Sequence, residues 1–436
     1  MDKNRIKILI FAAILYREPK KQRKMRILLI GEYSNVHHTL CEALRRAGHE
    51  VLLISDGDGW KNYPRDIDLR RHCSGMWGSL RYLARLATLL PRMRGYDVVQ
   101  IVNPVFLDVK VRWNRWTYDY LKRHNRLVSV GCFGDDYYVI RGMMNAALFD
   151  YSDFQISGRA IDHETNRRRY HAWVESPKAA LTQYVVDRAD CLMACLYEYW
   201  WVYKQAGMGD KLYYMPLPVG LKSADGTPVS ASSSAGKTFG RDVTDGDGKV
   251  RILLASQRQR GQMKGTDKIE PLLERLAADY PDRIELQRIV SVPFAEYQRF
   301  VALADVVVDQ LYSYTPAMAA LESLSQGKVV ISGFETAYAR FLNEQEAGVL
   351  PQDTGIVNLR PDDDDRNYQL LIRELTDIDR VRQLQAAARV FVLRYHEADT
   401  VAHRYLEAWQ SLSTLPSASE GETVEGSSSS NRPSQR

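Results

Sequence analysis

A cluster of basic side chains follows an apolar segment in the second half of the sequence. Residues 250–255 read VRILLA, a run suited to a buried strand, and the loop SQRQRGQMKG follows at 256–265. Its cations are Arg258, Arg260 and Lys264. Arginine can grip an anion with two parallel N–H donors and lysine supplies a point charge, so this loop is suited to a diphosphate. The alternative is a solvated basic loop, which is a common surface feature.

A second candidate site lies in residues 304–332, ADVVVDQLYSYTPAMAALESLSQGKVVIS. We expect a strand to end at Asp309 and a helix to begin after a polar loop, with Thr315 as N-cap and Pro316 in the first turn. Exposed amides at a helix start bind anions, so this helix and the basic loop predict one diphosphate pocket. Glu322, about two turns along the helix, is expected to face a cleft, where its carboxylate can accept two ribose hydroxyls. A solvated glutamate is the alternative.

Two adjacent carboxylates follow an expected strand in the first half of the chain. The segment GCFGDD at 131–136 comes directly after LVSV at 127–130. Asp135 and Asp136 are therefore candidates to orient or deprotonate an acceptor hydroxyl. The alternative is ordinary Gly-Asp turn chemistry with no catalytic role.

The elements that must position these residues alternate along the chain. In the first half we expect strands at 25–31, 50–55, 97–102, 127–132 and 191–194, and helices at 38–47, 80–93 and 178–188. In the second half we expect strands at 250–255, 284–289, 306–309 and 328–332, and helices at 267–279, 293–303 and 315–325. Strand–helix–strand units of this length predict parallel pairing. The pattern therefore predicts two open α/β sheets, and such sheets bind ligands at the carboxyl ends of their strands.

These patterns divide the chain into six segments. We expect an N-terminal extension at 1–24, a first Rossmann-like domain at 25–221, a flexible linker or insertion at 222–249, a second Rossmann-like domain at 250–376, helices that cross back at 377–413, and a disordered tail at 414–436. The linker is rich in Ser, Gly and Asp and has no apolar periodicity. The tail is rich in Ser, Glu and Pro.

Charge is concentrated at the N-terminal end. The 436 residues carry a formal net charge of +5, and residues 1–24 hold eight basic and two acidic side chains, so 8 − 2 = +6 there and 5 − 6 = −1 elsewhere. A nearly neutral body argues against nucleic-acid binding. The apolar run at 8–16 is far shorter than the roughly 20 residues of a spanning helix. We expect 1–24 to be an upstream start or loose extension, with a basic anchor on anionic lipid as the alternative.

The five cysteines predict neither a disulfide framework nor a metal site. They lie at positions 41, 73, 132, 191 and 195, without metal-binding spacing and without a nearby histidine cluster. Reduced and mostly buried thiols in a cytoplasmic protein are the simplest interpretation.

Together these motifs resemble GT-B glycosyltransferases, close to family 4 (glycosyl transferases group 1) of bacterial sugar transferases, over residues 25–413 apart from the linker. The resemblance implies two Rossmann-like doubly wound domains facing a central cleft, with 25–221 on the acceptor side and 250–376 binding the donor. It implies that Arg258 or Arg260 with Lys264-Gly265 binds the donor diphosphate. It also implies that Glu322 binds the ribose as the second Glu of a Glu-x7-Glu motif.

The sequence departs from this motif at Tyr314, where the family has the first Glu, which contacts the donor sugar. We expect Ser313, Tyr314 and Thr315 to form hydrogen bonds with the donor sugar or phosphate in its place. The resemblance further implies that a loop after the first strand faces the acceptor and the donor sugar. Its residues are Gly31, Glu32, Tyr33, Ser34, Asn35 and His38.

The function implied by the resemblance is a retaining glycosyltransferase of surface-polysaccharide biosynthesis. Its donor would be a UDP- or GDP-linked sugar and its acceptor a glycan or a lipid-linked glycan. This resemblance does not require a divalent cation, so we expect no metal and no cofactor besides the donor. Tyr314 keeps open a catalytically degenerate nucleotide-sugar-binding or assembly partner. A sugar-nucleotide epimerase is less favoured, because no histidine occurs between residues 172 and 395.

Two basic and aromatic stretches of the first domain bear on where the protein acts. They are residues 77–94, WGSLRYLARLATLLPRMR, and 111–126, VRWNRWTYDYLKRHNR. Amphipathic helices of this type rest on anionic membranes, so we expect a peripheral association with the inner face of the cytoplasmic membrane. Helices packed on the sheet with solvated arginines are the alternative, and no motif supports single-stranded nucleic acid as a ligand.

Overall fold

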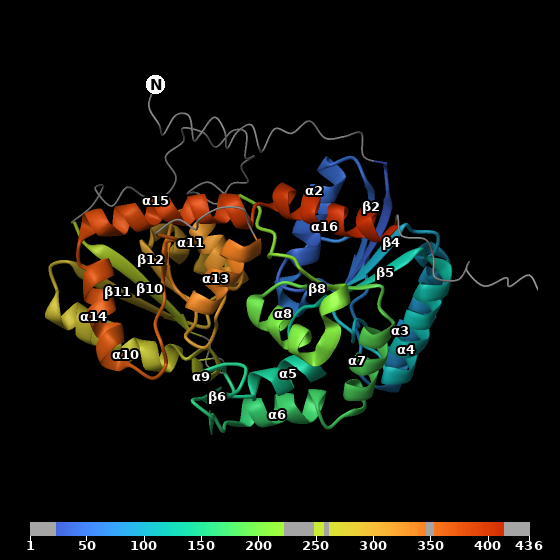
Figure 1. Cartoon of the computed structure of the whole chain (residues 1–436), viewed down its shortest axis with the longest axis horizontal. Helices are drawn as coiled ribbons and strands as arrows, with labels where there is room; N and C mark the ends of the chain where they lie inside the picture. The colour runs from blue at the N-terminus through green and yellow to red at the C-terminus, as the bar shows by residue number, and fades with distance from the viewer. Residues whose placement is uncertain (1–22, 222–247, 257–260, 346–352, 414–436) are drawn as a thin grey trace, which may run out of the picture.

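The computed structural model describes residues 23–221, 248–256, 261–345 and 353–413. The expected tail at 414–436, nearly all of the N-terminal extension and most of the expected linker lie outside these residues, as do Arg258 and Arg260. The described residues form two parallel sheets with helices packed around them, and Figure 1 shows the two sheets side by side. Within this part of the chain, no helix is long and apolar enough to cross a membrane.

Seven parallel strands form the first sheet, in the order β3-β2-β1-β4-β5-β8-β9. They are β1 (Arg26–Ile30), β2 (Glu50–Ser55), β3 (Ile67–Asp68), β4 (Val98–Ile101), β5 (Leu127–Cys132), β8 (Cys191–Ala194) and β9 (Leu212–Tyr214). The strands predicted at 50–55, 127–132 and 191–194 are confirmed with the same bounds. Strand order reverses between β1 and β4, and the carboxyl ends at such a switch point form a crevice.

Helices surround this sheet: α2 (Val36–Arg46), α3 (Gly75–Leu89), α4 (Val111–His124), α5 (Tyr137–Met143), α6 (Glu164–Trp173), α7 (Pro177–Arg188) and α8 (Tyr197–Tyr203). A small hairpin pairs β6 (Gln155–Ile156) with β7 (Arg159–Ala160). The helix predicted at 80–93 begins five residues earlier than expected, at Gly75, and residues Leu90–Met93 form a separate 3-10 turn that contains Pro91. Helix α6, ETNRRRYHAW, has no apolar stripe that the sequence could reveal.

The second sheet has five parallel strands in the order β11-β10-β12-β13-β14. They are β10 (Val250–Ser256), β11 (Ile284–Val290), β12 (Val306–Val308), β13 (Val329–Ile331) and β14 (Ile356–Val357). Its helices are α9 (Gly261–Lys264), α10 (Thr266–Asp279), α11 (Phe294–Leu303), α12 (Met318–Ser325), α13 (Thr336–Gln345) and α14 (Asp364–Leu375). Here too strand order reverses, between β10 and β12, so a second crevice is expected at their carboxyl ends.

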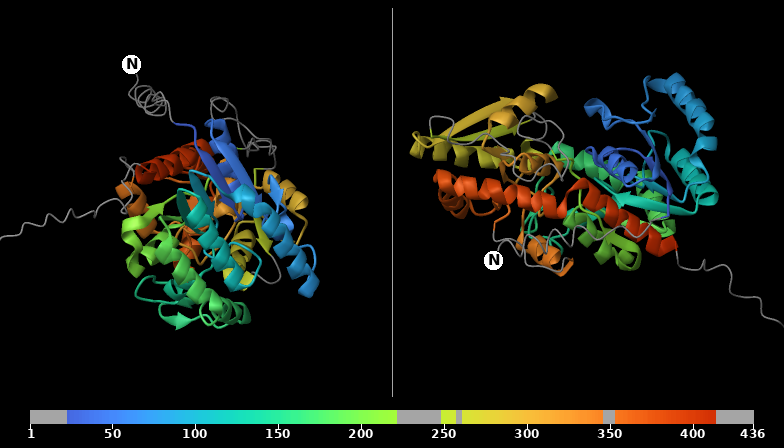
Figure 2. Two further views of the ribbon diagram at one scale, coloured as in Figure 1. Left: turned by 90° about the vertical axis from the view of Figure 1, so that its right-hand side faces the viewer. Right: turned by 90° about the horizontal axis from the view of Figure 1, so that it is seen from above.

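The C-terminal segment runs from the second sheet to the first as two helices. Helix α15 (Ile378–Tyr395) packs beside α12 of the second sheet, and α16 (Ala398–Ser413) packs on α2 of the first. Figures 1 and 2 show them in succession along one side of both sheets. Trp409 of α16 is fully buried, and Asp399 lies 2.5 Å from Arg46 of α2.

An aromatic cluster extends the apolar core of the first sheet into the second domain, whose own sheet also has separate buried clusters. The ring of Phe341 on α13 lies 4.4 Å from Trp200, 4.9 Å from Tyr214 and 5.4 Å from Tyr197 of the first domain, between ring centres. Phe341 is 4% exposed and belongs to the same buried cluster as the first sheet. The two domains therefore share a packed junction on this side of the cleft.

We expect Phe341→Ala to lower the free energy of unfolding by about 3–5 kcal/mol, because it removes a ring that both domains contact and leaves a cavity. Chemical denaturation measures this loss. Leu303→Ala is the control, because Leu303 is 53% exposed and its loss should cost within about 0.5 kcal/mol. Equal costs for the two substitutions would show that the junction carries no folding energy.

Candidate functional site

The two loops predicted to bind the donor lie against each other at the carboxyl ends of β10 and β12. The Lys264 ammonium lies 2.7 Å from Asp309 Oδ1, and the Leu311 amide donates to the Lys264 carbonyl at 2.7 Å. Gly265 has φ +69°, and a Cβ there would lie 2.7 Å from Leu311 Cβ, so only glycine fits this close approach. The structure therefore brings Lys264 and the loop after Asp309 into one place. Arg258 and Arg260 belong to the same loop but lie outside the described residues.

Asp309 fixes the position of Lys264. Its side chain is 2% exposed, and the hydroxyl of Ser332 donates to its second oxygen at 3.2 Å. The Lys264 side chain is 32% exposed, so it is only partly covered while Asp309 holds its ammonium. Sequence reasoning placed Asp309 only as the end of a strand and missed this role.

The loop that follows is held by a glutamate of the first domain. Glu198 on α8 accepts hydrogen bonds from the amides of Tyr314 (2.6 Å) and Thr315 (3.0 Å), and from the Thr315 hydroxyl. Burial raises the pKa of Glu198, and these hydrogen bonds oppose that rise. Two amides expected to bind a ligand anion are thus occupied by a carboxylate of the protein itself.

Helix α12 begins later than predicted, because Glu198 binds the amides of Tyr314 and Thr315. Thr315 is not the N-cap and Pro316 is not in the first turn, because α12 begins at Met318 with Ala317 as its N-cap. No side chain of the described residues caps α12. The anion-binding end of this helix therefore lies two to three residues later in the chain than the sequence predicted.

Tyr314, at the position of the family's first Glu, lies in the domain junction. It is 7% exposed, and its hydroxyl accepts a hydrogen bond from the Asp150 amide at 2.9 Å. Its ring lies 5.2 Å from Phe149 and 5.0 Å from Tyr151, between ring centres. Burial raises the pKa of Tyr314 to about 12. The side chain is occupied by contacts between the domains.

Ser313 is buried beside Tyr314. A Cβ on Gly333 would lie 1.9 Å from the Ser313 carbonyl oxygen, so the loop passes directly over the glycine that follows β13. Nearby, the Tyr151 hydroxyl donates to Glu335 Oε1 at 2.7 Å, a further link between the domains. Tyr314 and Thr315 bind protein groups of the first domain, whereas the buried Ser313 hydroxyl has no hydrogen-bond partner among the described residues.

Glu322 lies half-buried on α12. Burial first, and then the charge of Glu322, raise the pKa of Tyr63 in the first domain. Glu322 also contributes, after burial and Asp309, to raising the pKa of Tyr297 on α11. Glu322 therefore lies within electrostatic reach of one tyrosine in each domain.

On the opposite side, the loop after β1 is built around Glu32. Its carboxylate accepts hydrogen bonds from the amides of Tyr33 (2.8 Å), His37 (3.1 Å) and His38 (2.9 Å) at the start of α2. Burial raises the pKa of Glu32 to about 7 despite these bonds. The loop conformation is unusual, since Gly31, Ser34 and Asn35 all have positive φ angles. His38 is half-buried, and burial lowers its pKa.

A cavity of about 610 Å³ opens at this loop, at the switch point between β1 and β4. Its wall includes Gly31 and Glu32 after β1 and Val102 after β4. Gly31 has no room for a side chain, because a Cβ would lie 2.3 Å from Val102 Cγ1. The rest of the wall mixes charged groups with aromatic rings, among them Asp56, Arg70, Arg71, Tyr82, Asp108, Trp173 and Lys178. This mixture of polar groups and aromatic rings is suited to a carbohydrate-sized ligand.

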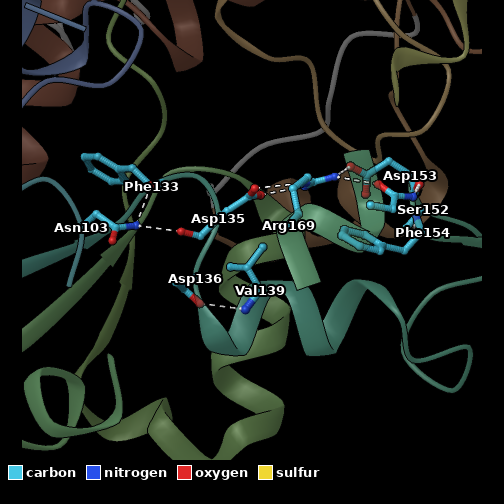
Figure 3. A network of polar contacts seen from close by, with 10 residues as sticks. Asn103, Phe133, Asp135, Asp136, Val139, Ser152, Asp153, Phe154 and Arg169 are labelled. Atoms are coloured by element: carbon cyan, nitrogen blue, oxygen red, sulfur yellow. Dashed lines mark hydrogen bonds and ion pairs between the residues drawn. The ribbon is translucent and has the colours of Figure 1, made fainter. Parts of the chain in front are cut away.

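Asp135 and Asp136 are both engaged by protein groups (Figure 3). Asp136 is fully buried, accepts from the Val139 amide at 2.8 Å as the N-cap of α5, and accepts from the Tyr203 hydroxyl at 2.7 Å. Burial raises its pKa to about 6. Asp136 is therefore a helix cap, with no exposed oxygen to contact an acceptor.

Asp135 forms a two-bond pair with Arg169, at 2.7 Å for both bonds. Arg169, on α6, also binds Asp153, so it bridges two carboxylates (Figure 3). Since both Asp135 oxygens already accept hydrogen bonds, this carboxylate orders the loop after β5. The described residues contain no group of three or more His, Cys, Asp or Glu side chains that could hold a metal ion.

Stability should depend on Glu32 with a defined sign. The folded-state pKa of about 7 exceeds the ordinary 4.5, so between these values the folded chain holds a proton that the unfolded chain has lost. Stability from this group is thus present at low pH and lost as pH rises to about 7. We expect the difference in unfolding free energy between wild type and Glu32→Gln to fall across that window and to level above it.

Chemical denaturation from about pH 5 to about pH 8 measures this difference. Glu42→Gln, an exposed change on α2, whose first amides Glu32 binds, is the control and should leave the pH profile of wild type unchanged. A pH-independent difference for Glu32→Gln would contradict the interpretation.

Solved structures similar to this chain share its two-sheet arrangement. The sucrose-phosphate synthase of Thermosynechococcus elongatus is 13% identical with a TM-score of 0.52, and the match covers 89% of this chain and 99% of that one. The catalytic domain of starch synthase IV from Arabidopsis thaliana, bound to ADP and acarbose, is 10% identical with a TM-score of 0.52, covering 89% of this chain and 99% of that one. An alpha-glucosyltransferase in complex with UDP is 11% identical with a TM-score of 0.51, covering 89% and 100%.

No protein-family model matches the sequence, and a search of curated proteins finds no match. At 10–13% identity the structural likeness concerns the fold. The chain has the predicted GT-B architecture, with two Rossmann-like parallel sheets facing a central cleft.

Proposed function

We propose that this chain is a glycosyltransferase that moves a sugar from a nucleotide-sugar donor to a glycan or lipid-linked acceptor. The observation that supports the proposal is the contact of Lys264 with Asp309 at the carboxyl ends of the second sheet, where the chain continues into the uncapped helix α12 that carries Glu322. The cavity at the carboxyl ends of the first sheet supplies a separate place for an acceptor. Two of the similar structures hold UDP or ADP, which agrees with a nucleotide-linked donor.

The chemistry assigned to the donor side is electrostatic. The donor diphosphate becomes more negative as the bond to the sugar breaks, and a fixed cation and helix amides stabilise that charge. Lys264, held by Asp309, supplies the cation, and the start of α12 supplies the amides. Glu322 accepts the ribose hydroxyls. No metal has a role in this scheme.

The acceptor side holds no free carboxylate base among Glu32, Asp135 and Asp136, since protein donors already bind all three. A retaining reaction, in which the leaving diphosphate takes the acceptor proton, fits this arrangement, and the resemblance to family 4 supports it. The biological setting we propose is surface-polysaccharide synthesis in the cytoplasm, at the inner face of the membrane.

A second candidate is a catalytically degenerate protein that binds nucleotide sugars or an assembly partner. The burial of Tyr314 in the domain junction favours it, because the family's sugar-binding Glu would occupy that position. A panel of nucleotide sugars separates the two candidates. Transfer or hydrolysis supports the enzyme, whereas a rise in melting temperature with UDP or GDP and no turnover supports binding alone.

We expect Glu322→Gln to weaken the binding of UDP or GDP by about tenfold or more, because a neutral amide replaces a charged acceptor of two ribose hydroxyls. Calorimetry and thermal shift measure the change. Glu296→Gln on the exposed face of α11 is the matched control. Unchanged nucleotide binding in Glu322→Gln would place the donor site elsewhere.

Lys264 needs a paired design, because Lys264→Ala alone leaves the buried Asp309 unpaired and destabilises the fold. The double variant Lys264→Ala/Asp309→Asn removes both charges. We expect it to remain folded and to lose the binding of the diphosphate nucleotide more than the binding of the free nucleoside, which lacks the phosphates. Equal loss of both would mean that Lys264 does not face the diphosphate.

A further inference from the structure

Helix α3 is apolar on the face that points away from the protein. Its inner face packs Tyr82, Leu86 and Leu89 into the domain. Its outward stripe consists of Met76, Trp77, Leu80, Ala84 and Ala87, and the first three are 79%, 74% and 57% exposed. At 3.6 residues per turn these five positions lie within one side of the helix. A surface helix normally carries polar groups there.

Large exposed apolar side chains are concentrated at this place. Of the eight in the described part of the chain, three lie in the first two turns of α3 and a fourth is Trp116 of α4. Trp116 stacks on Tyr120, with 6.0 Å between ring centres. The Tyr120 hydroxyl donates to the Leu90 carbonyl, just after α3, at 3.0 Å. We call the outward stripe of α3 the α3 surface.

Arginines border the α3 surface without acidic neighbours in sequence. Residues 69–96 contain no Asp or Glu and six arginines: Arg70, Arg71, Arg81, Arg85, Arg92 and Arg94. Arg81 and Arg85 are exposed along one edge of the stripe, and neither has a carboxylate partner among the described residues. An apolar stripe edged by arginines is the pattern of a helix that lies in the interface of an anionic bilayer.

The α3 surface adjoins the cavity of the first domain. Arg70, Arg71 and Tyr82 all line that cavity. Arg71 Nη2 also donates to the Gly75 carbonyl at 2.9 Å and to Ser79 Oγ at 2.7 Å, which ties the cavity rim to the first turn of α3. Figures 1 and 2 show α3 at the edge of the first domain away from the second, so the cleft between the domains stays clear of it.

We propose that the α3 surface docks on an anionic lipid bilayer and presents the cavity at the membrane surface. This identification of the acceptor rests on the proposed function. The acceptor is then an amphiphile whose lipid stays in the bilayer while its polar head enters the cavity. Trp77, Leu80 and Met76 enter the interface, and Arg81 and Arg85 face lipid phosphates. A second copy of the chain is a poor occupant, because the arginines that edge the two stripes would repel each other.

The test is co-sedimentation of the full chain with vesicles of phosphatidylcholine alone and of phosphatidylcholine with phosphatidylglycerol. We expect binding only to the anionic vesicles, weakened by salt. Two α3 variants, Trp77→Ser/Leu80→Ser and Arg81→Glu/Arg85→Glu, should each lower the partition coefficient by about tenfold or more. Their matched controls on the second domain, Leu303→Ser/Val390→Ser and Arg299→Glu/Arg366→Glu, should bind as wild type does.

Three results overturn the proposal. If both α3 variants still bind anionic vesicles as wild type does, other groups, such as the basic residues 1–24, are responsible for the binding. Self-association that only the α3 variants lose identifies a second copy as the occupant. If UDP or GDP stabilises the wild-type chain but the chain does not bind anionic vesicles, docking is refuted and the proposed function is unaffected. Vesicle binding without any nucleotide binding leaves docking standing and removes the function.

Discussion

The buried carboxylate of Glu198 is the contact on which the geometry of the cleft depends. It lies on a helix of the first domain and binds two backbone amides and one hydroxyl of the loop that leads into α12. A buried charge is tolerated only when its hydrogen bonds are satisfied, so the loop must stay where these three donors reach it. The position of α12, and with it Glu322, follows from that loop. The second domain is thus oriented by the first at the place where a donor would bind.

Further links surround this contact and close one side of the cleft. Tyr314 binds the Asp150 amide, Tyr151 binds Glu335, and the ring of Phe341 fills the space between the domains. The opposite side of the loop, where Lys264 and the start of α12 lie, keeps groups that can bind an anion. Tyr314, which the resemblance aligns with a sugar-binding Glu, is used in this junction, so under the proposed function other groups would bind the donor sugar.

The sequence predicted elements that have a clear period and missed contacts between distant segments. Buried strands such as 127–132 were predicted with their bounds, because short apolar runs next to turn residues have few other interpretations. The approach of Lys264 to the loop after Asp309 was also predictable, since both follow neighbouring strands of one parallel sheet. The start of α12 was misplaced because Glu198, more than 100 residues away, binds the amides that a Thr315 cap would have organised. The sequence suggested Asp136 as a catalytic candidate. Only the structure shows that it is buried and caps α5 through its hydrogen bond from the Val139 amide.

Hydrogen–deuterium exchange with and without UDP or GDP tests the account most directly. The account predicts that the amides of Tyr314 and Thr315 exchange slowly without nucleotide, because Glu198 holds them. It predicts that nucleotide adds protection in peptides covering residues 261–268 and 317–324. Fast exchange at Tyr314 and Thr315 in the free protein, or nucleotide protection confined to the first domain, would contradict it.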